Sequence, residues 1–261
     1  MKILVFVKQV PETDEVRLDP RTGTLNRDSV PSIMNPYDAY AAETALQLRE
    51  THGGTVHAIT MGPGQATAVL KEALAMGCDE AHLLSDRAFS GADSLATGYT
   101  LAKAAEKIGG YDLLLFGKCA SDAETAQTGP IVAELLDLPQ VTLVDAVTLQ
   151  DGWAVCRRDL GAQFQTVKVR LPALLAVTSQ INRPRYPRPS RIRTINEFPL
   201  TIWSAETLGC DPSRTGAAGS PSRTCKVFAP EQSRLDTRYF TGAPETIARA
   251  IADVLDAEHI L

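Results

Sequence analysis

The chain has 261 residues, of which 44% are hydrophobic and 22% are charged, a composition typical of a globular protein rather than a disordered chain or a membrane protein. Its formal net charge of -5 argues against a nucleic-acid-binding surface, so we expect no nucleic acid among its partners. The first apolar run, residues 3–7, is too short for a signal peptide, and we expect a cytoplasmic protein without membrane insertion.

Strand-like and helix-like segments alternate over the first half of the chain. In chain order they are strand 3–7, helix 39–49, strand 56–60, helix 66–76, strand 81–84, helix 94–107, strand 113–116 and helix 130–136. Asp93 is a suitable N-cap for the helix that follows it. Such alternation predicts a parallel sheet with helices on both faces.

The pattern changes after residue 140. Segments 141–149, 154–157 and 163–169 are strand-like and separated by turn residues, which predicts an antiparallel insertion. A buried strand is expected at 174–178, prolines interrupt the chain from 184 to 199, and a final helix is expected at 244–257. We therefore predict an α/β fold with a doubly wound, mostly parallel, Rossmann-like sheet that binds an adenine nucleotide. The nucleotide-binding domain would span 1–180, and an extended C-terminal arm with a terminal helix, outside the compact core, would span 181–261.

The strand 113–116 leads into a loop of small residues before the next helix. Gly117 allows a sharp turn at the carboxyl end of the strand, where ligands of open α/β sheets bind. The short or absent side chains of Thr125, Gln127, Thr128 and Gly129 would let backbone N–H groups approach a phosphate. No lysine follows in the Walker order, so we expect phosphate binding without cleavage. Equally well, Ser121, Asp122 and Thr125 could simply cap the helix.

Other polar or flexible residues follow neighbouring strands. Lys8 comes after the first strand and could neutralise a phosphate or contact a flavin, although a solvated lysine is the simpler interpretation. Met61 and Gly62 follow the second strand and could line an adenine ring, or merely form a turn. Asn35 or Asp38 most simply caps the helix 39–49 and could equally meet a ribose hydroxyl.

Metal and nucleophilic sites are not expected. The four histidines, at positions 52, 57, 82 and 259, are isolated in the sequence, and none forms a pair at metal-ligand spacing. The five cysteines lack a Cys-x-x-Cys pair, which favours free thiols. No nucleophile motif accompanies the nearby Asp122 and Glu124, so no self-contained catalytic site is visible.

Taken in order, residues 7–11, 35–43, 73–79, 117–118 with 126–129, and 182–186 resemble the beta subunit of electron transfer flavoprotein. The resemblance covers nearly the whole chain. It implies a heterodimer with an alpha subunit that holds an FAD, a beta subunit that binds a second adenine nucleotide, and electron shuttling between dehydrogenases and other acceptors.

Within this family the second nucleotide is AMP in ordinary members and FAD in electron-bifurcating ones. Residues 93–97 and 125–130 resemble the FAD type, whereas AMP-binding members usually carry Asn-Gln-Thr-Gly-Gln from position 126; at 119–124 the chain departs from the FAD-type pattern. The cofactor-binding residues implied by the motifs together are Val7, Lys8, Asn35, Asp38, Met61, Gly62, Asp93, Thr97, Gly117, Lys118, Thr125, Ala126, Gln127, Thr128 and Gly129.

The basic, proline-rich segment after Tyr186 coincides with the family's partner-recognition loop. It lacks the leucine that anchors acyl-CoA dehydrogenases, so the resemblance implies a different dehydrogenase with an acidic docking patch. The complementary arginines would be Arg185, Arg188, Arg191 and Arg193.

The leading interpretation is an FAD-binding beta subunit that relays electrons between a dehydrogenase or NADH and other acceptors, and NADH oxidation is expected only if it holds FAD. The alternatives are an AMP-binding structural beta subunit and, from another class, an ATP-binding sensor or ligase domain, which would bind ATP without a partner.

Overall fold

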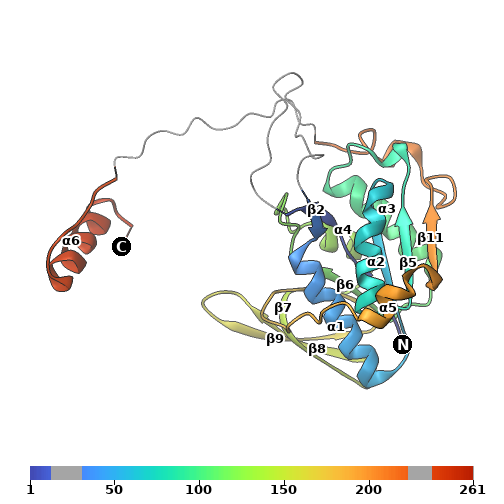
Figure 1. Ribbon diagram of the computed structural model, residues 1–261, viewed down its shortest axis with the longest axis horizontal. Coiled ribbons are helices and arrows are strands. Elements are labelled where there is room, and N and C mark those ends of the chain that lie inside the picture. Colours follow the sequence, from blue (N-terminus) through green and yellow to red (C-terminus); the bar gives the residue numbers. More distant parts are fainter. Residues whose placement is uncertain (13–30, 223–236, 261) are drawn as a thin grey trace. The chain divides into compact units, whose positions relative to one another are not determined.

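A computed structural model of the chain describes residues 1–12, 31–222 and 237–260 (Figure 1). The chain divides into two compact units, Met1–Lys226 and Val227–Leu261. The described strands are β1 (Lys2–Phe6), β2 (Gln9–Pro11), β3 (Ser32–Met34), β4 (Thr55–Met61), β5 (Glu80–Leu84), β6 (Leu113–Gly117), β7 (Gln140–Gln150), β8 (Trp153–Asp159), β9 (Phe164–Arg170), β10 (Ala173–Val177) and β11 (Leu200–Trp203). The described α-helices are α1 (Pro36–His52), α2 (Thr67–Met76), α3 (Ser94–Ile108), α4 (Thr128–Leu135), α5 (Pro189–Arg193) and α6 (Pro244–Ala257).

The first unit is built on a nine-stranded sheet with the order β11-β5-β4-β1-β6-β10-β7-β8-β9. The strands from β11 to β7 pair in parallel, whereas β7, β8 and β9 pair antiparallel. The chain runs from β1 through β4 to β5 in one direction and then returns to β6 on the other side of β1. The predicted doubly wound α/β fold with an antiparallel extension is therefore confirmed, and its topological switch point lies between β1 and β6.

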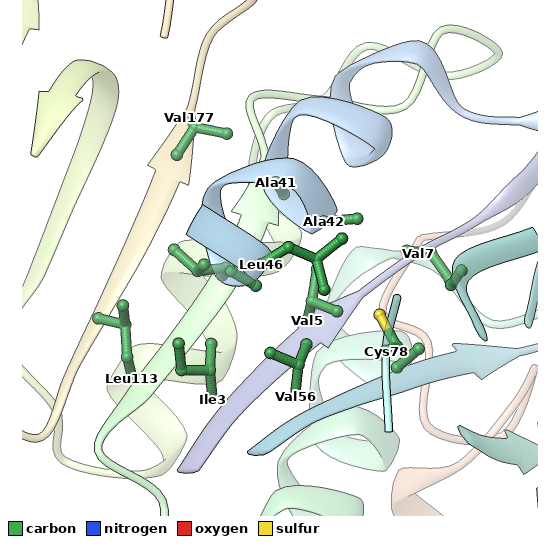
Figure 2. Close-up of a cluster of buried hydrophobic side chains, with 14 of the residues drawn as sticks. Ile3, Val5, Val7, Ala41, Ala42, Leu46, Val56, Cys78, Leu113 and Val177 are labelled. Atoms are coloured by element: carbon green, nitrogen blue, oxygen red, sulfur yellow. The ribbon is translucent and has the colours of Figure 1, made fainter. Parts of the chain in front are cut away.

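Side chains that alternate along the strands form two cores, one on each face of the sheet. Ile3 and Val5 of β1 lie with Leu46 of α1 on one face, where α2 also packs, as Figure 2 shows for Ile3, Val5 and Leu46. Leu4 and Phe6 lie on the opposite face with residues of α3 and α4. Because both faces are covered, the strands are apolar without interruption, which is the pattern that predicted them.

The segment 181–222 belongs to the same compact unit as the sheet, which corrects the expectation that it lies outside the compact core. β11 pairs in parallel with the edge strand β5, and the backbone N–H of Arg188 donates to Ala75 O at the end of α2. Main-chain pairing at a sheet edge does not depend on a side-chain pattern, so the sequence carried no signal for it. The boundary between the two compact units follows Lys226, whereas the predicted domain boundary followed residue 180.

The predicted final helix is confirmed as α6, with the bounds Pro244–Ala257. Among the described helices none combines the length and apolar character needed to cross a membrane. The predicted free thiols are confirmed for Cys78, Cys119, Cys156 and Cys210, and Cys225 lies outside the described residues.

Candidate functional site

The buried carboxyl group of Asp38 links the two strands at the switch point. It accepts hydrogen bonds from the backbone N–H of Lys8, at 2.8 Å, and of Gly117, at 3.2 Å. The carboxyl ends of β1 and β6 are therefore tied together by a residue from the first turn of α1. Gly117 makes this possible, because a Cβ at that position would lie 2.6 Å from the carbonyl carbon of Tyr37 and would also meet the Asp38 carboxylate.

Burial raises the pKa of Asp38 to about 7, because the charged carboxylate has lost its water. Hydrogen bonds from Asn35 and from the backbone of Lys8 and Gly117, together with the charge of Lys8, lower the pKa and oppose this effect. The linking group is therefore titratable near neutral pH.

Asn35 holds the loop that follows β6. Its side chain is fully buried, its Nδ2 donates to Cys119 O at 2.8 Å, and its Oδ1 accepts from the backbone N–H of Ser121 at 3.1 Å. The expectation that Asn35 or Asp38 caps α1 is wrong, because Asn35 is the N-cap residue but makes no side-chain capping bond, and the Asp38 carboxylate bonds to Lys8 and Gly117. Both side chains instead connect segments that are far apart in the sequence.

Lys8 pairs with the same loop. Its Nζ lies 2.6 Å from Asp122 Oδ1, and 43% of the Lys8 side chain is exposed. This arrangement differs from the simple solvated lysine weighed from the sequence, because the ammonium group already has a carboxylate partner. The pair is solvent-exposed, so its free energy is small, and a phosphate bound here would compete with Asp122 for Lys8.

The start of α4 lacks a side-chain cap. Gln127 is the N-cap residue, with helical φ and ψ, and its side chain makes no capping hydrogen bond. The capping alternative for Ser121, Asp122 and Thr125 is therefore wrong. Two loop residues without a glycine's freedom, Glu124 and Ala126, have φ values of 49° and 53°. Left-handed backbone and an uncapped helix start leave N–H groups directed out of the helix, which suits an anion.

The start of α3 lies beside this loop. The Asp93 carboxylate caps α3 by accepting from the backbone N–H groups of Leu95, at 3.0 Å, and Ala96, at 3.1 Å, as predicted. Ser94 Oγ donates to Thr125 Oγ1 at 3.3 Å, which joins the start of α3 to the loop that precedes α4. Thr97, half-buried, follows in the first turn of α3.

Asp93 also fixes the chain far downstream. Its Oδ2 accepts from Ser222 Oγ at 2.8 Å, and its backbone N–H donates to Ser220 Oγ at 2.8 Å. Burial raises the pKa of Asp93, but hydrogen bonds from Ala96, Ser222 and Leu95 outweigh it and hold the pKa below its usual value. The carboxylate is thus committed to internal contacts rather than free for a ligand.

The remaining predicted cofactor residues sit at the same edge of the sheet. Val7 is buried just after β1, Lys118 follows β6, and its backbone N–H donates to Val177 O at 2.8 Å. Met61 ends β4 and Gly62 follows it, on the side of β1 away from β6, where the Gly62 N–H donates to Leu84 O. The loop end at Thr128 and Gly129 opens α4, with Gly129 buried against Phe116.

A cavity of about 410 Å³ lies at the carboxyl ends of β6 and β10 and includes residues that the sequence did not single out. Lys118 is a predicted residue in its lining. The others are Tyr37, Leu143, Asp159, Leu160, Gly161, Thr178, Ser179 and Gln180. Residues 178–180 are polar and directly follow a buried strand. This sequence pattern could have identified them as part of the cavity.

The four predicted docking arginines differ in how exposed they are. Arg185 forms ion pairs with Glu43, at 2.7 Å, and with Glu50, and Arg191 Nη1 donates to Leu74 O and Cys78 O. Arg188 and Arg193 are exposed, with Arg188 only 3.7 Å from Glu50. The structure therefore gives Arg185 and Arg191 internal contacts and leaves Arg188 and Arg193 facing solvent.

Two histidines that are isolated in the sequence meet in the fold. His57 Nδ1 and His82 Nε2 are 3.3 Å apart, on the neighbouring strands β4 and β5, and both side chains are buried. The expectation that all histidines are isolated is wrong for this pair. Parallel pairing brings together residues separated by 25 positions.

Comparison with known proteins identifies similar chains along the full length. Residues 22–203 match the family described as "Electron transfer flavoprotein domain". The chain is 42% identical to the "Caffeyl-CoA reductase-Etf complex subunit CarD" of Acetobacterium woodii, covering 100% of both chains. It is 43% identical to the "Electron transfer flavoprotein subunit beta" of Thermoanaerobacterium thermosaccharolyticum, also covering 100% of both. "Protein FixA" of Azorhizobium caulinodans is 40% identical, over 99% of this chain and 93% of FixA.

Proposed function

This chain belongs to the electron transfer flavoprotein family as a beta subunit, and we propose that it binds FAD at the carboxyl edge formed by β1 and β6. Beta subunits of this family pair with alpha subunits, which supports the proposal that this chain works as part of a heterodimer. In the form that we favour, electrons come from a dehydrogenase or from NADH, and an electron pair from NADH is divided between two acceptors. Membership of this family favours electron transfer over an ATP-binding sensor or ligase domain.

The observation that carries this proposal is the uncapped start of α4 inside a loop that other elements hold in place. The backbone N–H groups at Thr128 and Gly129 would hold the pyrophosphate, and Lys8, released from Asp122, would neutralise it. The contact between Ser94 and Thr125 supports one ligand that touches both the α3 start and the loop. Asp38 and Asn35 would position this edge without contacting the ligand's reactive ring.

FAD, when bound, supplies the one- and two-electron chemistry, and the protein contributes binding, orientation and electrostatics. Thr97 would direct its hydroxyl toward the flavin from the first turn of α3, where the helix dipole favours electron-rich groups. The structure offers no Walker lysine at the loop, which fits a nucleotide that is held and not hydrolysed. The alternative within the family is AMP at the same phosphate site, with a structural role.

Counting nucleotides separates the two forms. The chain would be co-purified with its alpha subunit and denatured, and the released FAD and AMP would be quantified by chromatography. We expect two FAD and no AMP per heterodimer. One FAD and one AMP would instead make this subunit the scaffold for its partner's flavin, and the NADH-linked part of the proposal would be wrong.

Electron-partner docking would use the solvent-facing arginines Arg188 and Arg193 together with the exposed Tyr186. An acidic patch on a dehydrogenase or reductase would complement them. One relative is named as part of a caffeyl-CoA reductase complex, so an acyl-CoA reductase is the partner class to compare with other dehydrogenases. We expect the double variant Arg188→Glu/Arg193→Glu to slow electron delivery with its flavin content unchanged. The double variant Lys168→Glu/Arg170→Glu on β9 would be the charge-matched control, because both side chains are exposed, and equal rates for the two double variants would remove the docking role.

A further inference from the structure

A second polar cluster lies well away from the candidate nucleotide site. His57 is near the beginning of β4, and Glu80 and His82 are alternate residues of β5. The strands pair in register with His57 opposite Glu80, so all three side chains fall on the same face of the sheet. This face is the one covered by α3, and the cluster lies toward the amino ends of the strands, opposite to the loop after β6.

We propose that His57, Glu80 and His82 form a binding site for a divalent transition-metal ion, with Zn²⁺ as the best fit. The three candidate ligand atoms are His57 Nδ1, His82 Nε2 and Glu80 Oε2. Their separations are 3.3 Å between the two nitrogens, 3.5 Å from His57 Nδ1 to the carboxylate oxygen and 3.8 Å from His82 Nε2 to the same oxygen.

These distances match the size of a metal ion. A point equidistant from the three atoms lies about 2.1 Å from each of them, which is the length of a Zn–N or Zn–O bond. A direct hydrogen bond between the histidines would involve only their two ring nitrogens. It would not explain why the Glu80 carboxylate also lies close to both rings. The geometry therefore accommodates the ion with little movement of the side chains.

Surrounding contacts orient both rings. Thr55 Oγ1 lies 3.2 Å from His57 Nε2, and when Nε2–H donates to this hydroxyl, Nδ1 keeps its lone pair for a metal. The His82 ring stacks on Trp203 of β11, with centroids 4.6 Å apart, and lies nearly parallel to the His57 ring. Thr55 of β4 and Trp203 of β11 hold the rings in place before any ion binds.

The cluster is difficult to explain as a device for stability. His82 Nδ1 is buried without a hydrogen-bond partner in the described part of the chain. A buried polar atom without a partner destabilises the fold, and an apolar side chain at this position would avoid that cost.

The site has room for solvent on one side. Each histidine side chain is only 7% exposed, but that of Glu80 is 43% exposed, so an ion and a water ligand can enter past the carboxylate. Three protein ligands plus water is the arrangement of open zinc sites with two histidines and one glutamate. The proposal does not depend on the nucleotide that the chain binds.

Zinc binding by the full-length chain tests the site. The protein would be stripped with a chelator and titrated with Zn²⁺ against a chromophoric indicator. We expect one Zn²⁺ per chain and at least a tenfold loss of affinity in Glu80→Ala and in His57→Gln. His52→Gln is the matched control, because His52 is exposed at the end of α1, and we expect it to bind like the unchanged chain.

Co²⁺ provides a second measurement that reports the ligands. A four-coordinate site of nitrogen and oxygen ligands should give visible d–d absorption without a thiolate charge-transfer band, and both ligand variants should lose it. Glu80 is half-exposed, so its replacement leaves the buried core intact even if His57→Gln destabilises the chain. No stoichiometric binding by the unchanged chain, or equal affinity in Glu80→Ala, would overturn the site. Counting FAD and AMP is unaffected by either result.

Discussion

Helices α3 and α4 begin side by side at the carboxyl edge of the sheet, and they begin differently. Asp93 caps α3 through two backbone N–H groups, whereas the residue in the same position of α4, Gln127, caps nothing. The first backbone N–H groups of a helix have no partner within the helix. A capping side chain satisfies some of them, whereas an uncapped start leaves them able to bind a ligand. The difference favours the start of α4 over the start of α3 as the place at this edge where we propose that an anion binds.

The sharpest test of how the α4 loop is held concerns the pH dependence of Asp38. Its pKa is raised to about 7 in the folded protein, so its contribution to stability is fully present below the ordinary pKa and is lost as pH rises toward 7. At 1.36 kcal/mol per pKa unit the loss is about 4 kcal/mol. The side chain of the Asp38→Asn variant cannot ionise. Chemical unfolding from pH 4 to 8 should therefore show the fall in unfolding free energy only in the unchanged chain. Parallel pH profiles of unfolding free energy for the two proteins would contradict this prediction.

Gly117→Ala should break the link between the strands and the loop. The added Cβ would meet Tyr37 and the Asp38 carboxylate, and we expect a loss of about 3 kcal/mol in unfolding free energy. Gly64→Ala is the control, because a Cβ there has no neighbour within 4 Å. Similar denaturant midpoints for the two variants would show that the edge tolerates the extra atom.

Gln127→Asp gives α4 an acidic residue at its start, as α3 has. A carboxylate at this point repels a bound phosphate, so we expect nucleotide affinity to fall at least about tenfold, or 1.4 kcal/mol. Fluorescence titration of the heterodimer with FAD measures it. Gln127→Asn has the shape of Gln127→Asp without its charge, and we expect it to bind FAD with the affinity of the unchanged chain. If Gln127→Asp also keeps that affinity, the phosphate does not bind at the start of α4.

Removing the cap of α3 should have the smallest effect. Asp93→Ala removes the acceptor of two helix N–H groups and of the exposed Ser222 hydroxyl, and we expect a loss of about 1 kcal/mol by thermal unfolding. Gln127→Ala at the start of α4 should change stability by only a few tenths of a kcal/mol, since no cap is lost. Equal losses of stability in Asp93→Ala and Gln127→Ala would show that the starts of α3 and α4 do not differ in capping.

Prediction from the sequence succeeded where the signal was local. The apolar run before Gly117 and the acidic cap at Asp93 each depend on a few neighbouring residues, and both are found as expected. It failed for Asn35 and Asp38, which have the residue types of helix caps but bond to partners about 80 residues away at Ser121, Cys119 and Gly117. When a side chain can bond either within its own helix or to a distant segment, the tertiary fold decides which bond forms, and the adjacent residues in the sequence do not.

The sequence by itself determined the class of fold, the α3 cap, the final helix and the position of the loop after β6, because periodicity and capping arise within one or two turns of chain. Only the tertiary structure decided which strands are neighbours. That choice put β11 beside β5, tied Asp38 to both sides of the switch point and brought His57, Glu80 and His82 within reach of one ion. Strand order is set by burying two continuous apolar faces at once, a requirement of the whole chain that no single segment contains.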